Sequence, residues 1–330
     1  MNVALDSLII LITSYVIYLA GNYFTEASSS LGYFMHLQKS VKGATLDAIS
    51  SSLPELLTAL YAVIFFHQFE VGVGTIVGSA LFNVLVIPGI AVLVAPKVFH
   101  IGKEVIKRDA SFYIIAVISL ILAVLIKDTW ALIIPSIFLT AYVIYVLVIV
   151  GDVKKHRKKN LQELKKAKKN NSMSLRKTII TIIISMFFIA VATFFLTQSA
   201  IGLANNLNIP AFIVAFIIIA AATSVPDAVI SILNAKKGDI DDATSNVFGS
   251  NIFDIWIGLS LPIIIAYFLI GPTKIIFERL EYLVILLVST LTIYFMIFRT
   301  KKLSKKQGWI LLSLYLIIIL YVIITNSGLF

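Results

Sequence analysis

Two short stretches of this chain resemble each other, and their spacing decides the fold. Residues 51–58 read Ser-Ser-Leu-Pro-Glu-Leu-Leu-Thr, and residues 223–231 read Thr-Ser-Val-Pro-Asp-Ala-Val-Ile-Ser. A second matched pair follows, because residues 77–83 read Val-Gly-Ser-Ala-Leu-Phe-Asn and residues 248–254 read Phe-Gly-Ser-Asn-Ile-Phe-Asp. The first pair is offset by 172 residues (227 minus 55) and the second by 171 (254 minus 83). Two matched blocks at nearly one offset indicate an internal duplication.

The sequence around both blocks is too apolar for a water-soluble core. Of the 330 residues, 59% are hydrophobic and 13% are charged, whereas a soluble domain has about 25% charged residues. About 20 mostly apolar residues span a bilayer as a helix. The chain is therefore predicted to be an all-α integral membrane protein with ten transmembrane helices. They run approximately over 4–24, 41–66, 71–95, 109–127, 129–150, 178–203, 209–234, 242–269, 280–298 and 307–326.

Basic residues gather between particular spans. The segment 152–177 contains 11 of the 27 Lys and Arg residues, and further clusters lie at 97–108, 236–237 and 299–306. The positive-inside rule assigns all four to the cytoplasm, which ten alternating spans allow with both termini outside. The net charge of +10 then faces the anionic leaflet of the lipid bilayer. Nucleic acid is not an expected partner.

The duplication and the orientation together predict two inverted five-helix repeats. Repeat one covers about 41–95 and repeat two about 209–269, and an odd number of spans separates them, so they enter the membrane from opposite sides. Inverted repeats are typical of secondary transporters, whose sites lie at the midplane where helices are interrupted. We expect a first half over 1–151, a basic cytoplasmic linker over 152–177 and a second half over 178–330.

The interruptions are visible in the sequence. Pro54 and Pro226 each lie inside an apolar span, where a proline removes a backbone hydrogen bond and frees a carbonyl. Gly78 and Gly249 lie on the following span of each repeat and permit close helix approach.

Each repeat places one carboxylate directly after its proline, Glu55 in the first and Asp227 in the second. Asp254 lies within span eight, and its counterpart in span three is the neutral Asn83. An ionised group at this depth costs roughly 2.5–3.5 kcal/mol and is by default functional. No Lys, Arg or His is expected at the same depth, so a bound cation is the expected counter-charge. The polar neighbours are Ser51, Ser52, Ser79, Thr223, Ser224, Ser250 and Asn251.

The nature of these side chains restricts the ion. All the donors are oxygens, which suit the hard cations Ca²⁺ and Na⁺. A lone serine in such a helix usually bonds to the carbonyl four residues earlier, but acid, proline and serine recurring together in two copies favour a site. With no cysteine and four scattered histidines, a disulfide, thiolate, zinc or haem site is not expected, and no cofactor is predicted.

On these motifs the chain is identified as a member of the cation/calcium exchanger superfamily, and within it resembles the sodium/calcium exchangers. The resemblance covers essentially the whole chain. It implies that Glu55 and Asp227 are the principal Ca²⁺ ligands and that Asn83 and Asp254 flank the centre. It further implies overlapping Na⁺ and Ca²⁺ sites completed by Ser52, Ser79, Ser224 and Ser250 and by the carbonyls of Ser51 and Thr223.

Residues 71–79 and 251–254 are similar to the potassium-dependent branch, in which an acid at the position of Asp254 is tied to K⁺. Potassium-independent prokaryotic relatives also carry an acid there, so K⁺ co-transport stays open. The chain departs from the family pattern at Ser50 and Ala222, where glycine is usual, and at Asp47, where an apolar residue is usual. Asp47 either lines the inward vestibule or pairs with Lys42.

The resemblance implies a multi-pass plasma-membrane antiporter, not an enzyme, that exchanges Na⁺ for Ca²⁺ by alternating access. Because each half supplies part of one site, the protein is expected to function as a monomer. By analogy, spans 4–24 and 178–203 are expected to slide. The nearest alternative is a Ca²⁺/H⁺ exchanger of the same superfamily. An intramembrane aspartyl protease lacks its Gly-x-Gly-Asp signature here, and a passive cation channel is disfavoured by the inverted repeats.

Overall fold

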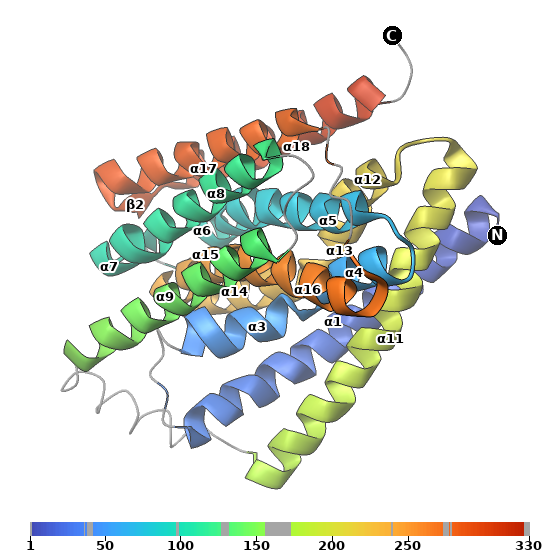
Figure 1. Ribbon diagram of the computed structural model, residues 1–330. Helices are drawn as coiled ribbons and strands as arrows, with labels where there is room; N and C mark the ends of the chain where they lie inside the picture. The colour runs from blue at the N-terminus through green and yellow to red at the C-terminus, as the bar shows by residue number, and fades with distance from the viewer. Residues whose placement is uncertain are drawn as a thin grey trace.

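The computed structural model describes residues 2–35, 37, 42–96, 99–126, 132–155, 173–238, 240–272, 277 and 279–326. These segments are almost entirely helical, and five π-helical turns, η1 to η5, lie within them (Figure 1). The elements of the first half are α1 (Val3–Phe34), η1 (Gly43–Asp47), α3 (Ala48–Ser51), α4 (Leu53–Ile64), α5 (Phe69–Leu81), η2 (Phe82–Val86), α6 (Ile87–Val94), β1 (Phe99–His100), α7 (Lys103–Val105), η3 (Ile106–Ala110), α8 (Ser111–Leu125) and α9 (Ile133–Lys155).

The second half repeats part of this order. Its elements are α11 (Leu175–Leu207), α12 (Ala211–Val214), η4 (Ala215–Ile219), α13 (Ala220–Thr223), α14 (Val225–Lys237), α15 (Ile240–Phe253), η5 (Asp254–Gly258), α16 (Ser260–Ile270), α17 (Leu280–Thr300), β2 (Lys302–Leu303) and α18 (Lys305–Asn326). The elements from η1 to α6 follow the same order as those from η4 to α16: a π-helical turn, three α-helices, a second π-helical turn and a last α-helix. The internal duplication in the sequence is therefore also present in the structure. Residues 156–172, most of the predicted linker, lie outside the described residues.

Both predicted helix breaks are present. One residue, Ser52, separates α3 from α4, and one residue, Ser224, separates α13 from α14. Their backbone angles are nearly the same, with φ −91° and ψ 5° at Ser52 and φ −78° and ψ −1° at Ser224. Pro54 and Pro226 follow in the first turn of the next helix, where a proline is tolerated because the missing amide has no helical partner. The α13–α14 axis bends by 43°.

The spans divide into central and peripheral helices. In the most apolar windows of α5–η2–α6 and α15–η5–α16, 78% and 67% of the residues are buried, against 22% in α18 and 28% in α1 and α11. The peripheral helices expose rows of large apolar side chains, as expected where they face lipid. Figure 1 shows α1 and α11 side by side along one flank and α17 with α18 along the opposite flank.

Among the described residues, eight helices are long and apolar enough to cross a membrane, and the bent pair Ala211–Thr223 and Val225–Lys237 makes a ninth. The one predicted span that is not among these nine, 41–66, corresponds to η1, α3 and the shorter apolar helix α4. The count of ten and the outside position of the termini stay predictions.

Close packing joins the two repeats. A Cβ added to Gly78 on α5 would lie 2.1 Å from the carbonyl oxygen of Phe216 on η4, so only glycine fits there. The prediction of close approach at Gly78 is confirmed. Helix α5 of repeat one is therefore in backbone contact with η4 of repeat two, and the two breaks lie close together, since Ser224 of the second donates to Glu55 next to the first.

Candidate functional site

The ten predicted site residues are all fully buried. They come from the two breaks, from α5 and α15, and from the π-helical turns η2 and η5 that follow those helices. Their exposed fraction is 0% at Ser51, Ser52, Glu55, Ser79, Asn83, Thr223, Ser224, Asp227, Ser250 and Asp254.

Glu55 is held by hydroxyls from both repeats. Its Oε1 accepts from Ser79 Oγ at 3.3 Å and from Ser224 Oγ at 3.4 Å, and Ser224 also donates to Ser79 at 2.8 Å. Its Oε2 is buried without a hydrogen-bond partner. The carboxylate of repeat one therefore lies beside the break of repeat two with one oxygen uncommitted.

Asp227 accepts more side-chain hydrogen bonds than Glu55 does. Ser250 Oγ donates to its Oδ1 at 2.6 Å and Asn246 Nδ2 to the same oxygen at 3.3 Å, while Asn83 Nδ2 from repeat one donates to its Oδ2 at 3.0 Å. Hydrogen bonds to an ionised group are short and strong. Both oxygens of Asp227 are therefore positioned, in contrast to Glu55.

Asn83 connects the repeats. Besides Asp227 it donates to Asn251 Oδ1 at 3.0 Å, and Asn251 in turn donates to the carbonyl of Ala80 at 3.3 Å. Asn83 lies in η2, and π-helical turns in membrane helices redirect side chains and are frequent at functional sites. Its own Oδ1 is buried and unpartnered.

Asp254 occupies the corresponding π-helical turn, η5. Both of its oxygens are buried without a hydrogen-bond partner. The η5 turn packs against α4, the helix that carries Glu55. An acid in this position is expensive to ionise unless a cation or a proton accompanies it.

The remaining hydroxyls at the breaks differ from one another. Ser51 Oγ lies 3.4 Å from Ser250 Oγ and donates to the carbonyl of Asp47 at 2.8 Å. Thr223 Oγ1 donates to the carbonyl of Ile219 at 3.0 Å, the usual local bond of a helical threonine. Ser52 Oγ is buried with no partner. Of these hydroxyls, Ser52 has its oxygen least committed to the protein.

Taken together, the described side chains that surround Glu55 and Asp227 are serines and asparagines, with no Lys or Arg among their hydrogen-bond partners. Two carboxylates from opposite repeats, serine hydroxyls and amide oxygens are ligand types for hard cations. Among the described residues, no three Asp, Glu or His side chains form a single metal cluster. A site with two carboxylates and neutral oxygens suits an ion that must also be released.

Sequence reasoning missed Asn246. It donates to Asp227 and, at 3.2 Å, to Ser231, so it holds α14 against α15. The available signal was its spacing, because Asn246 lies one turn before Ser250 on the same helix face. Thr58, fully buried one turn after Pro54 with an unpartnered Oγ1, was also missed.

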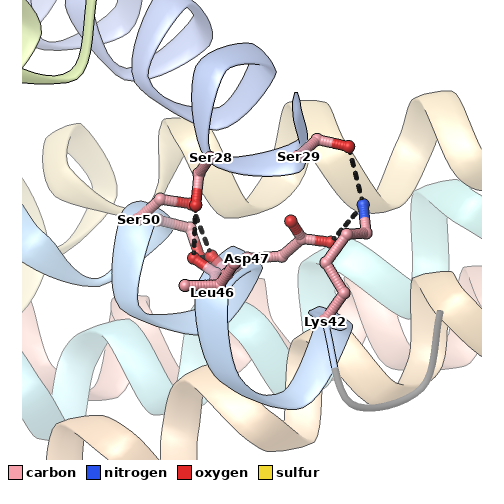
Figure 2. A network of polar contacts seen from close by, with 7 residues as sticks. Ser28, Ser29, Lys42, Leu46, Asp47 and Ser50 are labelled. Atoms are coloured by element: carbon pink, nitrogen blue, oxygen red, sulfur yellow. Dashed lines mark hydrogen bonds and ion pairs between the residues drawn. The ribbon is translucent and has the colours of Figure 1, made fainter. Parts of the chain in front are cut away.

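Among the described residues, two ion pairs lie outside the centre, one partly exposed and one buried. Lys42 Nζ contacts Asp47 Oδ2 at 2.9 Å, so the pairing alternative for Asp47 is confirmed (Figure 2). Arg108 contacts the adjacent Asp109 with Nε at 2.7 Å and Nη2 at 3.0 Å.

Asp109 also binds neighbouring helices. It accepts from Tyr145 on α9 at 3.2 Å and from Ser245 on α15 at 2.8 Å. Because Ser245 lies on α15, this second pair helps to fix the helix that carries Asn246 and Ser250 of the central site.

The family model described as "Sodium/calcium exchanger protein" matches residues 6–151 and 177–324 of the chain. This chain belongs to the sodium/calcium exchanger family. It is a multi-pass membrane protein, and like its relatives it is a transporter and not an enzyme.

The relatives that match most of the chain have modest sequence identity to it, and a more similar relative matches a shorter part. The chain is 25% identical to uncharacterized membrane protein MJ0091 of Methanocaldococcus jannaschii over 304 residues, covering 92% of this chain and 93% of that protein. It is 29% identical to inner membrane protein YrbG of Escherichia coli over 251 residues, covering 75% of each. Sodium/potassium/calcium exchanger 1 of Gallus gallus is 38% identical over 133 residues, which are 40% of this chain and 20% of that protein.

The fold matches that of a solved exchanger. The sodium-calcium exchanger NCX_Mj, soaked with 2.5 mM Na⁺ and 0.1 mM Ca²⁺, superposes with a TM-score of 0.67 and 23% identity, covering 96% of this chain and 98% of that one. At this identity the likeness establishes the fold.

Proposed function

We propose that this exchanger binds either one Ca²⁺ or Na⁺ ions at the centre between Glu55 and Asp227 and carries them in opposite directions. The observation that supports this most directly is a fully buried carboxylate in each repeat that accepts a hydrogen bond from the other repeat, Glu55 from Ser224 and Asp227 from Asn83, with Glu55 Oε2 free of hydrogen bonds. Two negative charges match one Ca²⁺ or two Na⁺. Because the same oxygens serve both, binding of one ion excludes the other.

Ser52, Ser79, Ser224 and Ser250, with the carbonyls of Ser51 and Thr223, complete these overlapping sites in the proposal. Pro54 has no amide for the carbonyl of Ser50 four residues earlier, and Pro226 has none for that of Ala222, so each break has a freed carbonyl directly before the one named in the proposal. Carbonyls freed in this way are the usual ligands at broken membrane helices.

Asp254 is proposed to bind a further monovalent cation or a proton. Its two unpartnered oxygens and the packing of η5 against α4, which carries Glu55, support this role. Potassium is one candidate, in keeping with the similarity to the sodium/potassium/calcium exchangers. In this arrangement the third acid adds one charge to be balanced in each transport cycle.

Alternating access is proposed to use α1 and α11 as the moving element. The two helices pack along each other, joined by Ser30 with Thr178 at 3.0 Å and by Asn206 with Asp6 at 2.8 Å. They also cover the breaks, since a Cβ on Gly21 of α1 would lie 2.7 Å from Pro226 Cγ. A sliding α1 would therefore alter the contacts of the second break directly.

The proposed topology has ten spans, the halves 1–151 and 178–330, a cytoplasmic linker over 152–177 and both ends outside, in a monomer of the plasma membrane. The chain has no cysteine, so single introduced cysteines report sidedness without background. Asn2→Cys is expected to react with an impermeant maleimide from outside, and Lys237→Cys only from the cytoplasm. The reverse pattern would overturn the orientation.

The test of function is ⁴⁵Ca²⁺ uptake into proteoliposomes loaded with Na⁺ and diluted into choline, with and without external K⁺. Uptake that requires internal Na⁺ is expected. A K⁺ requirement would support potassium co-transport. Uptake that ignores Na⁺ and follows a pH gradient would replace the proposal with Ca²⁺/H⁺ exchange.

A further inference from the structure

The end of α1 meets the start of repeat one through side chains that the central site does not use. Lys42 Nζ donates to Ser29 Oγ on α1 at 2.8 Å and contacts Asp47 Oδ2 on η1 at 2.9 Å. Next to it, Ser28 Oγ on α1 donates to the carbonyl of Leu46 at 3.1 Å (Figure 2). Lys42 therefore bridges the two elements: its ammonium group contacts α1 and the acid of repeat one at once.

This bridge is largely removed from water. The side chains of Lys42 and Asp47 are 23% and 8% exposed, and Asp47 Oδ1 is buried without a partner. Removing one member of a buried ion pair leaves the other charge uncompensated, which is strongly unfavourable. Separating α1 from η1 breaks the hydrogen bonds from Lys42 to Ser29 and from Ser28 to the carbonyl of Leu46, and so removes the α1 contact of an ammonium group that Asp47 holds in place.

The stem of Lys42 is packed against α1 as well. A Cβ added to Gly32 would lie 2.9 Å from Lys42 Cγ and 3.3 Å from a Leu46 methyl carbon. The absence of a side chain at Gly32 is what lets Lys42 lie flat on the helix. Any displacement of α1 along its axis must therefore change the contacts of Lys42 with Gly32 and Ser29.

Asp47 is also linked to the first break. Its carbonyl accepts from Ser50 Oγ at 2.9 Å and from Ser51 Oγ at 2.8 Å, and Ser51 lies 3.4 Å from Ser250 of the central site. A change in the position of Asp47 is thus transmitted to the hydroxyls beside Glu55 through two hydrogen bonds.

We infer that Lys42 and Asp47 tether α1 to repeat one and keep the cytoplasmic side of the site closed, so that this pair sets how readily the inward-facing state forms. The inference rests on the proposed movement of α1. The Arg108–Asp109 pair provides the contrast, because Asp109 accepts from Tyr145 on α9 and Ser245 on α15, whereas Lys42 donates to Ser29 on α1.

The test measures how readily the cytoplasmic side of the site opens, whichever ions the protein exchanges. Ala48, fully buried next to Asp47, is changed to cysteine in the cysteine-free chain, and its reaction with a hydrophilic maleimide is followed in inside-out vesicles. Lys42→Gln and Asp47→Asn are each expected to raise the labelling rate about tenfold, the equilibrium change that corresponds to roughly 1.4 kcal/mol. Lys42→Arg keeps the charge and is expected to stay near the parent rate.

Matched controls separate the tether from a general loss of structure. Lys103→Gln removes an exposed lysine without a carboxylate partner among the described side chains, and no change in labelling is expected. The double variant Lys42→Gln/Asp47→Asn is expected to label no faster than either single variant, because both remove one interaction. Gly32→Ala, which displaces Lys42 without removing a charge, is expected to raise labelling as well.

Unchanged labelling in Lys42→Gln and Asp47→Asn would overturn the inference, and so would an equal rise in Lys103→Gln. If Asp47→Asn does not fold, the comparison of Lys42→Gln with Lys42→Arg decides the matter. Exchange is measured on the same preparations. Failure of Na⁺ to drive uptake in the parent would reject the proposed function, whereas an unaltered labelling rate rejects the tether alone.

Discussion

The two repeats have nearly the same backbone at the centre but different side chains. Each contributes a one-residue break, a proline and an acid. In repeat one the partner helix carries Asn83, an amide that donates to Asp227 of the other repeat, whereas in repeat two the same position is Asp254, whose oxygens have no partner. The duplication thus supplies a symmetrical frame, and a single difference between amide and acid makes the charge of the site asymmetrical.

The largest effect is expected from neutralising either of the two acids, one in each repeat, that form the proposed Ca²⁺ site. Glu55→Gln and Asp227→Asn each keep the shape but halve the charge of the proposed Ca²⁺ site, and each is expected to lower Ca²⁺ exchange at least about 100-fold, or roughly 2.7 kcal/mol. The measurement is ⁴⁵Ca²⁺ uptake normalised to reconstituted protein. Parent rates in either variant would reject the site.

The contact that holds the repeats together is the next test. Gly78→Ala brings a Cβ to 2.1 Å from the Phe216 carbonyl oxygen, and we expect a loss of about 1–3 kcal/mol in stability. Gly151→Ala is the control, since a Cβ there meets nothing within 4 Å. Thermal unfolding in detergent measures both. Equal melting temperatures would show that α5 and η4 are not packed this closely.

Asn83 and Asp254 occupy corresponding positions in the two repeats, and exchanging amide and acid at each position tests whether the two have different functions. Asp254→Asn is expected to keep Ca²⁺ exchange within about tenfold while abolishing any dependence on K⁺ or on pH that the parent shows. Asn83→Asp removes two donated bonds and adds a charge beside Asp227, so it is expected to weaken exchange more than Asp254→Asn does. Uptake with varied K⁺ and pH measures both variants, and the opposite ranking would contradict the asymmetry.

The smallest effect is expected at Ser52 and Ser224, the serines at the two helix breaks, which differ in their hydrogen bonds. Ser224 Oγ donates to Glu55 and Ser79, whereas Ser52 Oγ has no partner. Ser224→Ala is expected to lower stability by about 0.5–1.5 kcal/mol, and Ser52→Ala is expected to leave stability unchanged and weaken ion binding only. Melting temperatures with and without Ca²⁺ distinguish these outcomes. Equal losses of stability in the two variants would indicate equivalent serines.

Sequence reasoning was effective where function requires a local signature. Pro54 and Pro226 predicted the breaks because proline disrupts a helix wherever it lies in the interior, and Gly78 predicted close approach because only glycine permits it. The acids were found because an ionisable group is rare in an apolar span. Each of these signals depends on residues within one or two turns of the chain.

Other features have no local signature. Asn246 belongs to the site because α14 lies against α15, and Asp109 is satisfied by Tyr145 and Ser245 from two other helices. The positions of the π-helical turns η2 and η5 were likewise not predicted, since they add one residue to a helix without a distinctive composition.

The amino-acid sequence by itself determined that this chain is a membrane protein with a duplicated, proline-broken core and buried acids, because apolar length, repeat offset and proline chemistry are properties of the chain alone. Only the tertiary structure decided which repeat supplies the donors to each acid, and that Lys42 joins α1 to Asp47. The physical reason is that hydrogen bonds and ion pairs act over about 3 Å. Which groups come that close depends on how distant helices pack.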